Sequence, residues 1–357
     1  MTANTVIFTG SKTITKANIG LNNWFWPFDT ARINPDLSTF SIAKAAPISV
    51  AYQACCWKYC EISKGVFDWT MTDKWVNAWK TLGKKMGAEL GWTPDWANAS
   101  MTAGLGNKAP TNMKDFADWV RAVGTRYNGQ ILYWTIRNEP RFSQAGAYYF
   151  IDTAAKYAEM TRVASQILKS INPNNKVMGI EMAVLSQVNT EFINFANADA
   201  SGYDAGYGTG AGTTGKNWID IVSVHPYTMP VDGAIANEAN NIADWATFKT
   251  VMSTLGIGSL PIWASEFMFT GSDFNGNISR MLRNCTLSLL NSDMFIHYGW
   301  GASSAQWNGN DLIGLKSRII WNSFCLTAFS SAWTQAVLNG TTGNIEVTQS
   351  NGNVFIV

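Results

Sequence analysis

Short apolar runs alternate along this chain with longer stretches in which apolar residues recur at the three- and four-residue spacing of a helix. Each apolar run has the length of a buried strand. The expected strands are Ile19–Trp24, Ile48–Gln53, Lys85–Gly91, Ile131–Arg137, Lys176–Glu181, Ile219–His225, Pro261–Ser265 and Met294–Trp300. Strands and helices that alternate in this way are typical of parallel sheets built from βα units.

The helical stretches complete these units. Asn172-Pro173 ends the longest of them, because the residue before a proline is kept out of the helical region, and Thr111-Asn112 can cap another. Helices are expected at about Asp36–Ala45, Asp73–Leu82, Met113–Tyr127, Tyr148–Ile171, Glu191–Asn197, Glu238–Leu255, Gly276–Leu290 and Lys316–Gln335. Eight strands with a helix after each predict an α/β fold, a (β/α)8 (TIM) barrel over residues 1–336.

Two segments fall outside the repeated pattern. Ser201–Gly215 is rich in glycine and lacks apolar periodicity, so it is expected to be a long loop, either a surface insertion or a loop that reaches a ligand. Residues 337–357 contain two short apolar runs joined by Ser350-Asn351-Gly352. A hairpin of this size is not stable alone, so we expect a C-terminal β tail that packs on the barrel or joins a small accessory sheet.

Charge is scarce and balanced. The 26 basic and 25 acidic residues of the 357-residue chain give a net charge of +1, which provides no broad field to attract nucleic acid or an anionic membrane. No apolar run is long enough for a membrane span or a signal peptide. The low charge and the many Asn, Thr, Ser and Gly residues nevertheless favour an extracellular or virion-associated protein.

The five cysteines are an odd number, and Cys55, Cys56 and Cys60 are crowded together. This spacing does not suit a disulfide framework. A zinc site is also disfavoured, because the only two histidines, His225 and His297, are distant in sequence and no second cysteine pair has ligand spacing. Buried free thiols are therefore expected, with no metal and no other cofactor.

Two glutamates follow predicted strands of the barrel. Glu139 comes after the fourth strand, in Asn138-Glu139-Pro140, and Glu266 comes after the seventh. Catalytic groups of such barrels lie at the carboxyl ends of the strands, and a carboxylate there is costly to bury unless it is useful. The two strand ends face each other across the barrel mouth, where two carboxylates can cleave a glycosidic bond. The alternative is that either glutamate only pairs with a nearby arginine such as Arg137.

The segments YWTIRNEP, VSVHPY and LPIWASEF, in this order and each at a strand end, resemble glycoside hydrolase clan A. Within that clan, KGVFDWTMTDKWVNAWKTLGKKMGAELGWTPDWA is similar to family 39. The resemblance covers most of Ile19–Gln335. It implies a retaining (β/α)8 glycosidase that cleaves an oligo- or polysaccharide through a covalent glycosyl-enzyme intermediate and needs no metal.

The same resemblance assigns roles to individual residues. Glu139 matches the general acid/base and Glu266 the nucleophile. Asn138 matches an asparagine that binds the sugar 2-hydroxyl. His225 and Tyr227 match a strand-six His-Pro-Tyr in which the tyrosine bonds the nucleophile and the histidine contacts substrate or the acid/base.

Aromatic side chains at strand ends suit a carbohydrate substrate. Trp92 and Trp96 after the third strand and Trp300 after the eighth are expected to offer flat platforms to sugar rings. The second strand departs from the family pattern, since many relatives carry an arginine there; Gln53 or Lys58 is a possible substitute.

Two other functions remain open from the sequence. One is a carbohydrate-binding adhesin that keeps the glycosidase scaffold without turnover, although both glutamates are present. The other is a metal-dependent barrel hydrolase, which two histidines support poorly.

Overall fold

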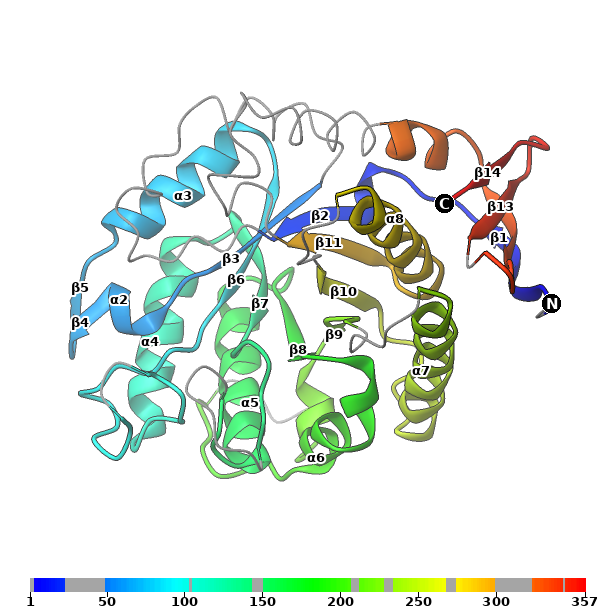
Figure 1. The fold of residues 1–357 in the computed structure, drawn as a ribbon. Helices are drawn as coiled ribbons and strands as arrows, with labels where there is room; N and C mark the ends of the chain where they lie inside the picture. Colours follow the sequence, from blue (N-terminus) through cyan, green and yellow to red (C-terminus); the bar gives the residue numbers. More distant parts are fainter. Residues whose placement is uncertain are drawn as a thin grey trace.

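The structure is a computed structural model that describes residues 3–22, 49–102, 105–142, 150–206, 212–227, 234–267, 274–298, 323–342 and 344–357. Its centre is a closed parallel barrel of eight strands, ordered β10-β11-β2-β3-β6-β7-β8-β9 (Figure 1). The strands are β2 (Ile19–Asn22), β3 (Val50–Ala54), β6 (Lys85–Glu89), β7 (Ile131–Thr135), β8 (Lys176–Met182), β9 (Ile221–Val224), β10 (Ile262–Phe267) and β11 (Met294–Tyr298). The predicted (β/α)8 fold is confirmed, and each of the eight predicted strands corresponds to one of these.

Large side chains fill the interior of the barrel. The rings of Tyr133 and Trp263 meet there with their centroids 4.5 Å apart, and Tyr52 is 2% exposed. A Cβ atom on Gly87 would lie 2.5 Å from the Tyr52 ring, so the tyrosine fits because this neighbouring strand position has no side chain. The barrel is therefore a packed core, and any substrate must bind at its mouth.

Helices surround the barrel on its outer side (Figure 1). Asn112 accepts a hydrogen bond from the Lys114 amide and caps α4, as predicted, and Thr153 caps α5 in the same way. The helices are α2 (Trp57–Cys60), α3 (Thr70–Thr81), α4 (Met113–Arg126), α5 (Ala154–Ile171), α6 (Glu191–Asn197), α7 (Ala234–Thr254) and α8 (Phe274–Asn291), with 3-10 turns η1 (Lys16–Asn18), η2 (Leu185–Asn189) and η3 (Gly215–Trp218). The helix predicted near Asp36–Ala45 lies outside the described residues.

One predicted helix is partly wrong. Of Lys316–Gln335, residues 316–322 are outside the described part of the chain, residues 323–328 are helical, and β12 (Trp333–Leu338) already begins at Trp333. Trp333 is fully buried and packs against Phe355 with ring centroids 5.5 Å apart. Tertiary packing of this aromatic side chain thus favours the strand over local helical periodicity.

The C-terminal tail joins a four-stranded antiparallel sheet rather than forming a hairpin alone. Its order is β1 (Thr5–Lys12), β12, β13 (Ile345–Gln349) and β14 (Val354–Ile356). The sheet lies at one side of the barrel (Figure 1) and begins before the predicted boundary at residue 337. Lys12 at the end of β1 donates from Nζ to the Ser292 carbonyl 2.8 Å away, next to barrel strand β11. The sequence pattern did not reveal β1.

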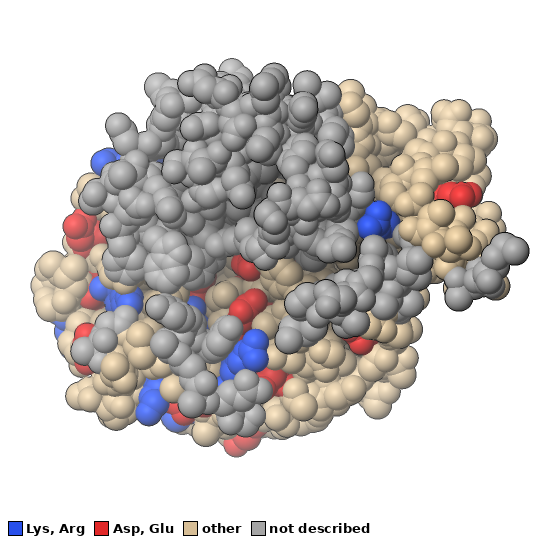
Figure 2. Space-filling view, in the orientation of Figure 1, with Lys and Arg blue, Asp and Glu red and all other residues tan. Residues whose placement is uncertain are grey.

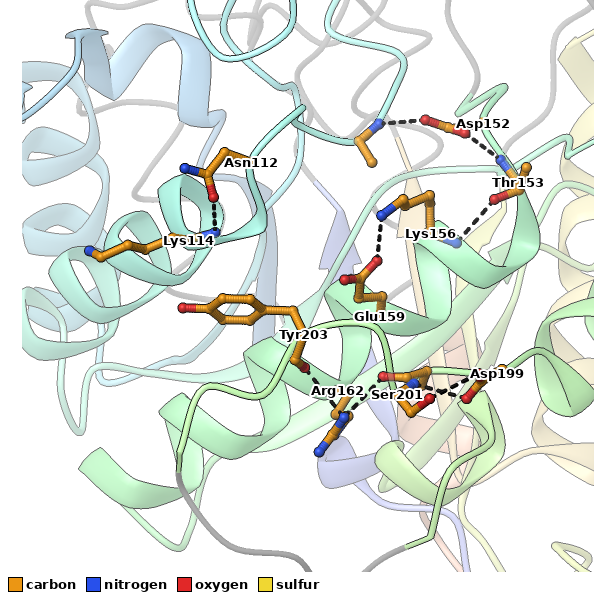
Figure 3. A network of polar contacts seen from close by, with 12 residues as sticks. Asn112, Lys114, Asp152, Thr153, Lys156, Glu159, Arg162, Asp199, Ser201 and Tyr203 are labelled. Carbon is orange, nitrogen blue, oxygen red and sulfur yellow. Dashed lines mark hydrogen bonds and ion pairs between the residues drawn. The ribbon is translucent and has the colours of Figure 1, made fainter.

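The described parts of the glycine-rich loop pack on the outside of α5 (Figure 3). Arg162 donates to the carbonyl of Tyr203 over 3.3 Å and pairs with Asp204 at 3.2 Å. A Cβ on Gly202 would lie 2.8 Å from the Glu159 carboxylate, so the close approach depends on glycine. This segment connects α6 to β9 and therefore enters the barrel at the face opposite its catalytic mouth, which favours the surface insertion over the ligand loop.

The surface carries mixed charge. On the face shown in Figure 2, basic and acidic side chains of the described residues are interspersed and neither sign dominates. Among the described residues, no helix combines the length and the apolar character needed to cross a membrane. All five cysteines are buried free thiols, as predicted.

Candidate active site

Glu139 and Glu266 meet at the mouth of the barrel. Glu139 follows β7 and Glu266 lies near the end of β10, three strands further around the barrel. A carboxylate oxygen of each lies within 4.8 Å of the other. The side chains of Glu139 and Glu266 are 16% and 11% exposed, so both carboxylates are largely buried.

His225 follows β9 and lies between the two carboxylates. Its Nδ1 is 2.8 Å from Oε1 of Glu139 and 3.9 Å from Oε1 of Glu266. Burial of this fully buried ring disfavours the imidazolium, but the charges of Glu266, Glu139 and Glu181 outweigh that cost and raise the pKa of His225 to about 9. At neutral pH the ring therefore carries a proton and donates from Nδ1 to Glu139.

Tyr227 contacts the second glutamate. Its hydroxyl donates to Oε1 of Glu266 over 3.0 Å. Burial raises the pKa of Glu266 to about 7, against the lowering effect of His225 and of the Tyr227 hydrogen bond, while the charge of Glu139 adds to the rise. The pKa values of His225 and Glu266 thus depend on each other's charge, a coupled arrangement that is common at functional sites.

A buried ion pair supports the backbone that carries Asn138 and Glu139. Arg137 Nη1 donates to Glu89 Oε1 over 3.0 Å, and the Asn138 amide donates to the same oxygen over 2.9 Å. Gly91 makes this packing possible, because a Cβ there would lie 2.5 Å from the Ile136 carbonyl oxygen and 2.8 Å from the Arg137 side chain. Arg137 thus has Glu89 as its ion-pair partner, which does not support the alternative in which it only pairs with a glutamate of the mouth.

The backbone at Glu139 is strained. Its φ of 44° lies in the left-handed region that residues other than glycine seldom adopt, at a cost of about 1–3 kcal/mol. Tyr157 of α5 helps to hold this turn, since its hydroxyl donates to the Arg137 carbonyl over 2.9 Å. Strain that the surrounding structure maintains is a common property of active sites.

Two further carboxylates near the mouth were not found by sequence reasoning. Glu89 ends β6 and Glu181 lies near the end of β8; they are 2% and 1% exposed. Burial raises the pKa of Glu181 to about 8, and the charge of Glu89 adds to the rise. Both satisfy the rule that singled out Glu139, a carboxylate at the end of an apolar strand, so that rule would have found them if applied to every strand.

The tryptophans are placed differently from the expected open platforms. Trp92 is 3% exposed, with the Arg137 guanidinium 3.6 Å and the Lys58 ammonium 4.7 Å from its ring centroid. These cations stabilise the indole and cover it. Trp96 is half-buried and donates from Nε1 to the Glu61 carbonyl over 3.1 Å.

The third expected platform, Trp300, lies outside the described residues. Asn138 is half-buried beside Glu139, in reach of the same space. The structure therefore brings together Glu139, Glu266, His225, Tyr227 and the backbone of Asn138, and leaves Trp96 to pack against the helical layer.

Among the described residues, one group of side chains has the spacing of metal ligands. The ligand atoms of Glu139, His225 and Glu266 all lie within 4.8 Å of one another. A cation there would have to displace the proton that the raised pKa of His225 keeps on the ring at neutral pH. The donor set therefore fits proton transfer better than metal binding.

Comparison with known proteins agrees with this geometry. The sequence model of glycosyl hydrolase family 10 matches residues 35–162, which include Asn138 and Glu139. The chain resembles the clan A glycoside hydrolases. No curated protein matches the sequence.

Solved structures of clan A glycoside hydrolases share the fold. The family 39 enzyme from Xanthomonas axonopodis pv. citri superposes with a TM-score of 0.63 and 14% identity over 96% of this chain and 71% of its own. A monomeric β-xylosidase from Caulobacter crescentus CB15 superposes with a TM-score of 0.62 and 14% identity, over 96% of this chain and 75% of its own. A family 30 subfamily 8 xylanase from Clostridium acetobutylicum superposes with a TM-score of 0.60 and 14% identity, over 97% of this chain and 81% of its own. The resemblance to clan A predicted from the sequence is confirmed.

Proposed function

We propose that this chain is a retaining glycoside hydrolase that cleaves an oligo- or polysaccharide by double displacement. The observation that carries the proposal is the pair Glu139 and Glu266, whose carboxylate oxygens approach within 4.8 Å at the barrel mouth. Retaining enzymes hold their two carboxyl groups about 5–5.5 Å apart, whereas inverting enzymes leave room for a water molecule between them. The short approach supports a direct nucleophile.

In the first step, a Glu266 oxygen attacks the anomeric carbon while Glu139 protonates the leaving oxygen, so the glycosidic bond breaks as the glycosyl-enzyme ester forms. In the second step, Glu139 takes a proton from water, which attacks the same carbon and releases Glu266. Tyr227 and His225 orient the two carboxylates through the hydrogen bonds described above. The Asn138 side chain is proposed to bind the sugar 2-hydroxyl, a contact that strengthens in the transition state.

The acid/base changes role between the two steps, and His225 is placed to assist that change. With Glu139 ionised after the first step, the 2.8 Å contact to the His225 imidazolium stabilises its charge. Because the structurally similar proteins include a xylosidase and a xylanase, xylan is the first polymer to test as a substrate.

The decisive experiment determines the anomeric configuration of the released sugar and how the rate depends on the leaving group of the substrate. We expect retention by NMR of the first-formed sugar, a loss of at least about 1000-fold in kcat for Glu266→Gln, and for Glu139→Ala a much larger loss with poor leaving groups than with activated aryl glycosides. Glu159→Gln, outside the mouth on α5, is the matched control and should keep full activity. Full activity of Glu266→Gln contradicts the proposal, and binding without release of reducing ends favours the adhesin.

A further inference from the structure

A series of nearly parallel aromatic rings leads from the helical layer to the outer surface of the barrel. Trp119 of α4 is fully buried and stacks on Trp69 with centroids 5.7 Å apart and planes 11° apart. Trp69 in turn stacks on Phe67 at 5.0 Å and 13°. Phe67 and Trp69 are half-buried, so the outer end of the series reaches solvent.

These two rings form one wall of a groove of about 600 Å³. The antiparallel hairpin of β4 (Glu61–Ser63) and β5 (Val66–Phe67) contributes Phe67. α4 contributes the rest of the lining with residues that recur at helical spacing, namely Asp118, Arg121, Ala122, Thr125 and Arg126.

Two charged side chains of the groove, Arg126 and Asp118, are held in place by ion pairs. Arg126 donates to both oxygens of Asp73 over 3.0 and 2.6 Å, and its guanidinium lies 5.2 Å from the Trp69 ring centroid. Asp118 pairs with Lys114. Arg121 is the third charged residue of the lining. Because the charges of Arg126 and Asp118 are matched by their partners, the groove carries little net charge.

Aromatic rings beside fixed hydrogen-bonding groups recognise a neutral sugar, which has apolar C–H faces and a rim of hydroxyls. The groove is open to solvent, so a sugar unit of a longer chain can enter it. None of its lining residues belongs to the cluster of Glu139, His225 and Glu266.

We propose that this groove is a second glycan-binding site, which holds a neutral polysaccharide on the outer surface of the barrel. The proposal rests on the proposed function, because a polymer-cleaving enzyme gains from holding its substrate at a second point. Binding to two sites of one chain raises the local substrate concentration at the mouth.

Affinity electrophoresis in gels with xylan, mixed-linkage β-glucan, galactomannan or arabinan tests the site in a Glu266→Gln background, which removes turnover. We expect retardation by at least one polymer and about tenfold weaker binding after Phe67→Ala, the loss of one stacking contact. Val66→Ala is the matched control, since Val66 precedes Phe67 on the same strand, is 51% exposed and does not line the groove. Thr125→Arg fills the groove from an exposed position and guards against misfolding of Phe67→Ala.

Retardation by none of the four polymers, or equal binding by Phe67→Ala, Thr125→Arg and Val66→Ala, overturns the proposal. On an active background, the groove variants should keep wild-type kcat on a small aryl glycoside and lose activity only on the polymer. This separates the two proposals: an active Glu266→Gln contradicts the hydrolase mechanism, while unchanged binding by the groove variants contradicts only the second site.

Discussion

His225 is the residue on which the charges of the barrel mouth converge. Its Nδ1 lies between the carboxylates of Glu139 and Glu266, and Glu181 is a further buried acid that interacts with the ring. A protonated ring in this place lets carboxylates share a small volume that they could not occupy together unaided. The histidine is therefore an electrostatic part of the site as well as a contact.

Tyr227→Phe tests whether the Tyr227 hydrogen bond lowers the pKa of Glu266, the proposed nucleophile. The lost hydrogen bond normally lowers the pKa of Glu266, so its removal should shift the acid limb of the kcat/KM profile above its wild-type position near pH 7. A hydrogen bond to a charged group contributes about 1.5–3 kcal/mol, which corresponds to about 10- to 100-fold in kcat/KM. An unshifted acid limb would show that Tyr227 does not act through Glu266.

Glu181→Gln tests the cost of a buried acid. The pKa of Glu181 is raised to about 8 in the folded protein from 4.5, so the unfolded chain releases this proton first and the wild type should lose stability as pH rises between these values. Glutamine resembles the protonated form and does not titrate. We expect the variant to be more stable than the wild type at pH 8.5, by a few kcal/mol at most, and little changed at pH 4.5.

Thermal unfolding at several pH values measures this difference. Glu346→Gln on the accessory sheet is the control. A parallel pH dependence of Tm in Glu181→Gln and wild type would refute the assignment.

The barrel strands could be predicted from the sequence, but β1 and the start of β12 could not. All eight barrel strands were located because strands covered on both faces are almost continuously apolar. β1 was missed because it is half-exposed and pairs with β12, at the other end of the chain, so no local pattern marks it. Helical periodicity could not reveal that Trp333 is buried by Phe355.

In the candidate active site, too, strand positions could be predicted from the sequence but contacts between side chains could not. Strand order places Glu139 and Glu266 across the mouth, but only the packing of side chains shows that Arg137 and Lys58 cover Trp92. Contacts between side chains of different units, such as Glu89 with Arg137, depend on three-dimensional fit that periodicity does not encode.

Gly91→Ala tests the fit between β6 and β7. The new Cβ would lie 2.5 Å from the Ile136 carbonyl oxygen, which must shift and displace Arg137 and the Glu139 backbone with it. We expect a loss of about 1–3 kcal/mol in the free energy of unfolding and a larger loss of kcat than of substrate affinity. Gly258→Ala, where the nearest atom is 3.3 Å away, is the control; equal behaviour of the two variants in denaturant titration and kinetics would contradict the prediction.

The accessory sheet connects both ends of the described chain to one side of the barrel. Deletion of residues 3–12 removes β1, exposes the edge of β12 and breaks the Lys12 contact to the Ser292 carbonyl. An unpaired strand edge promotes association between molecules. We expect a lower Tm, by about 5 °C or more, and concentration-dependent light scattering. Removal of residues 1–3 is the control; it keeps Asn4, whose Oδ1 accepts a hydrogen bond from the Gly340 amide, and should leave Tm and light scattering unchanged.

Closure of the barrel also has a consequence for biosynthesis. Phe295 of β11 pairs with Ile19 of β2, and β1 pairs with β12, so β1 and β2 find these partners only among strands that are synthesised much later. During translation, β2 must therefore keep one edge unpaired until β11 has emerged, and β1 until β12 has emerged. Contacts so distant in sequence slow folding and prolong the exposure of apolar surface. High-level expression of this protein should therefore benefit from slow translation or from chaperones that shield the open barrel.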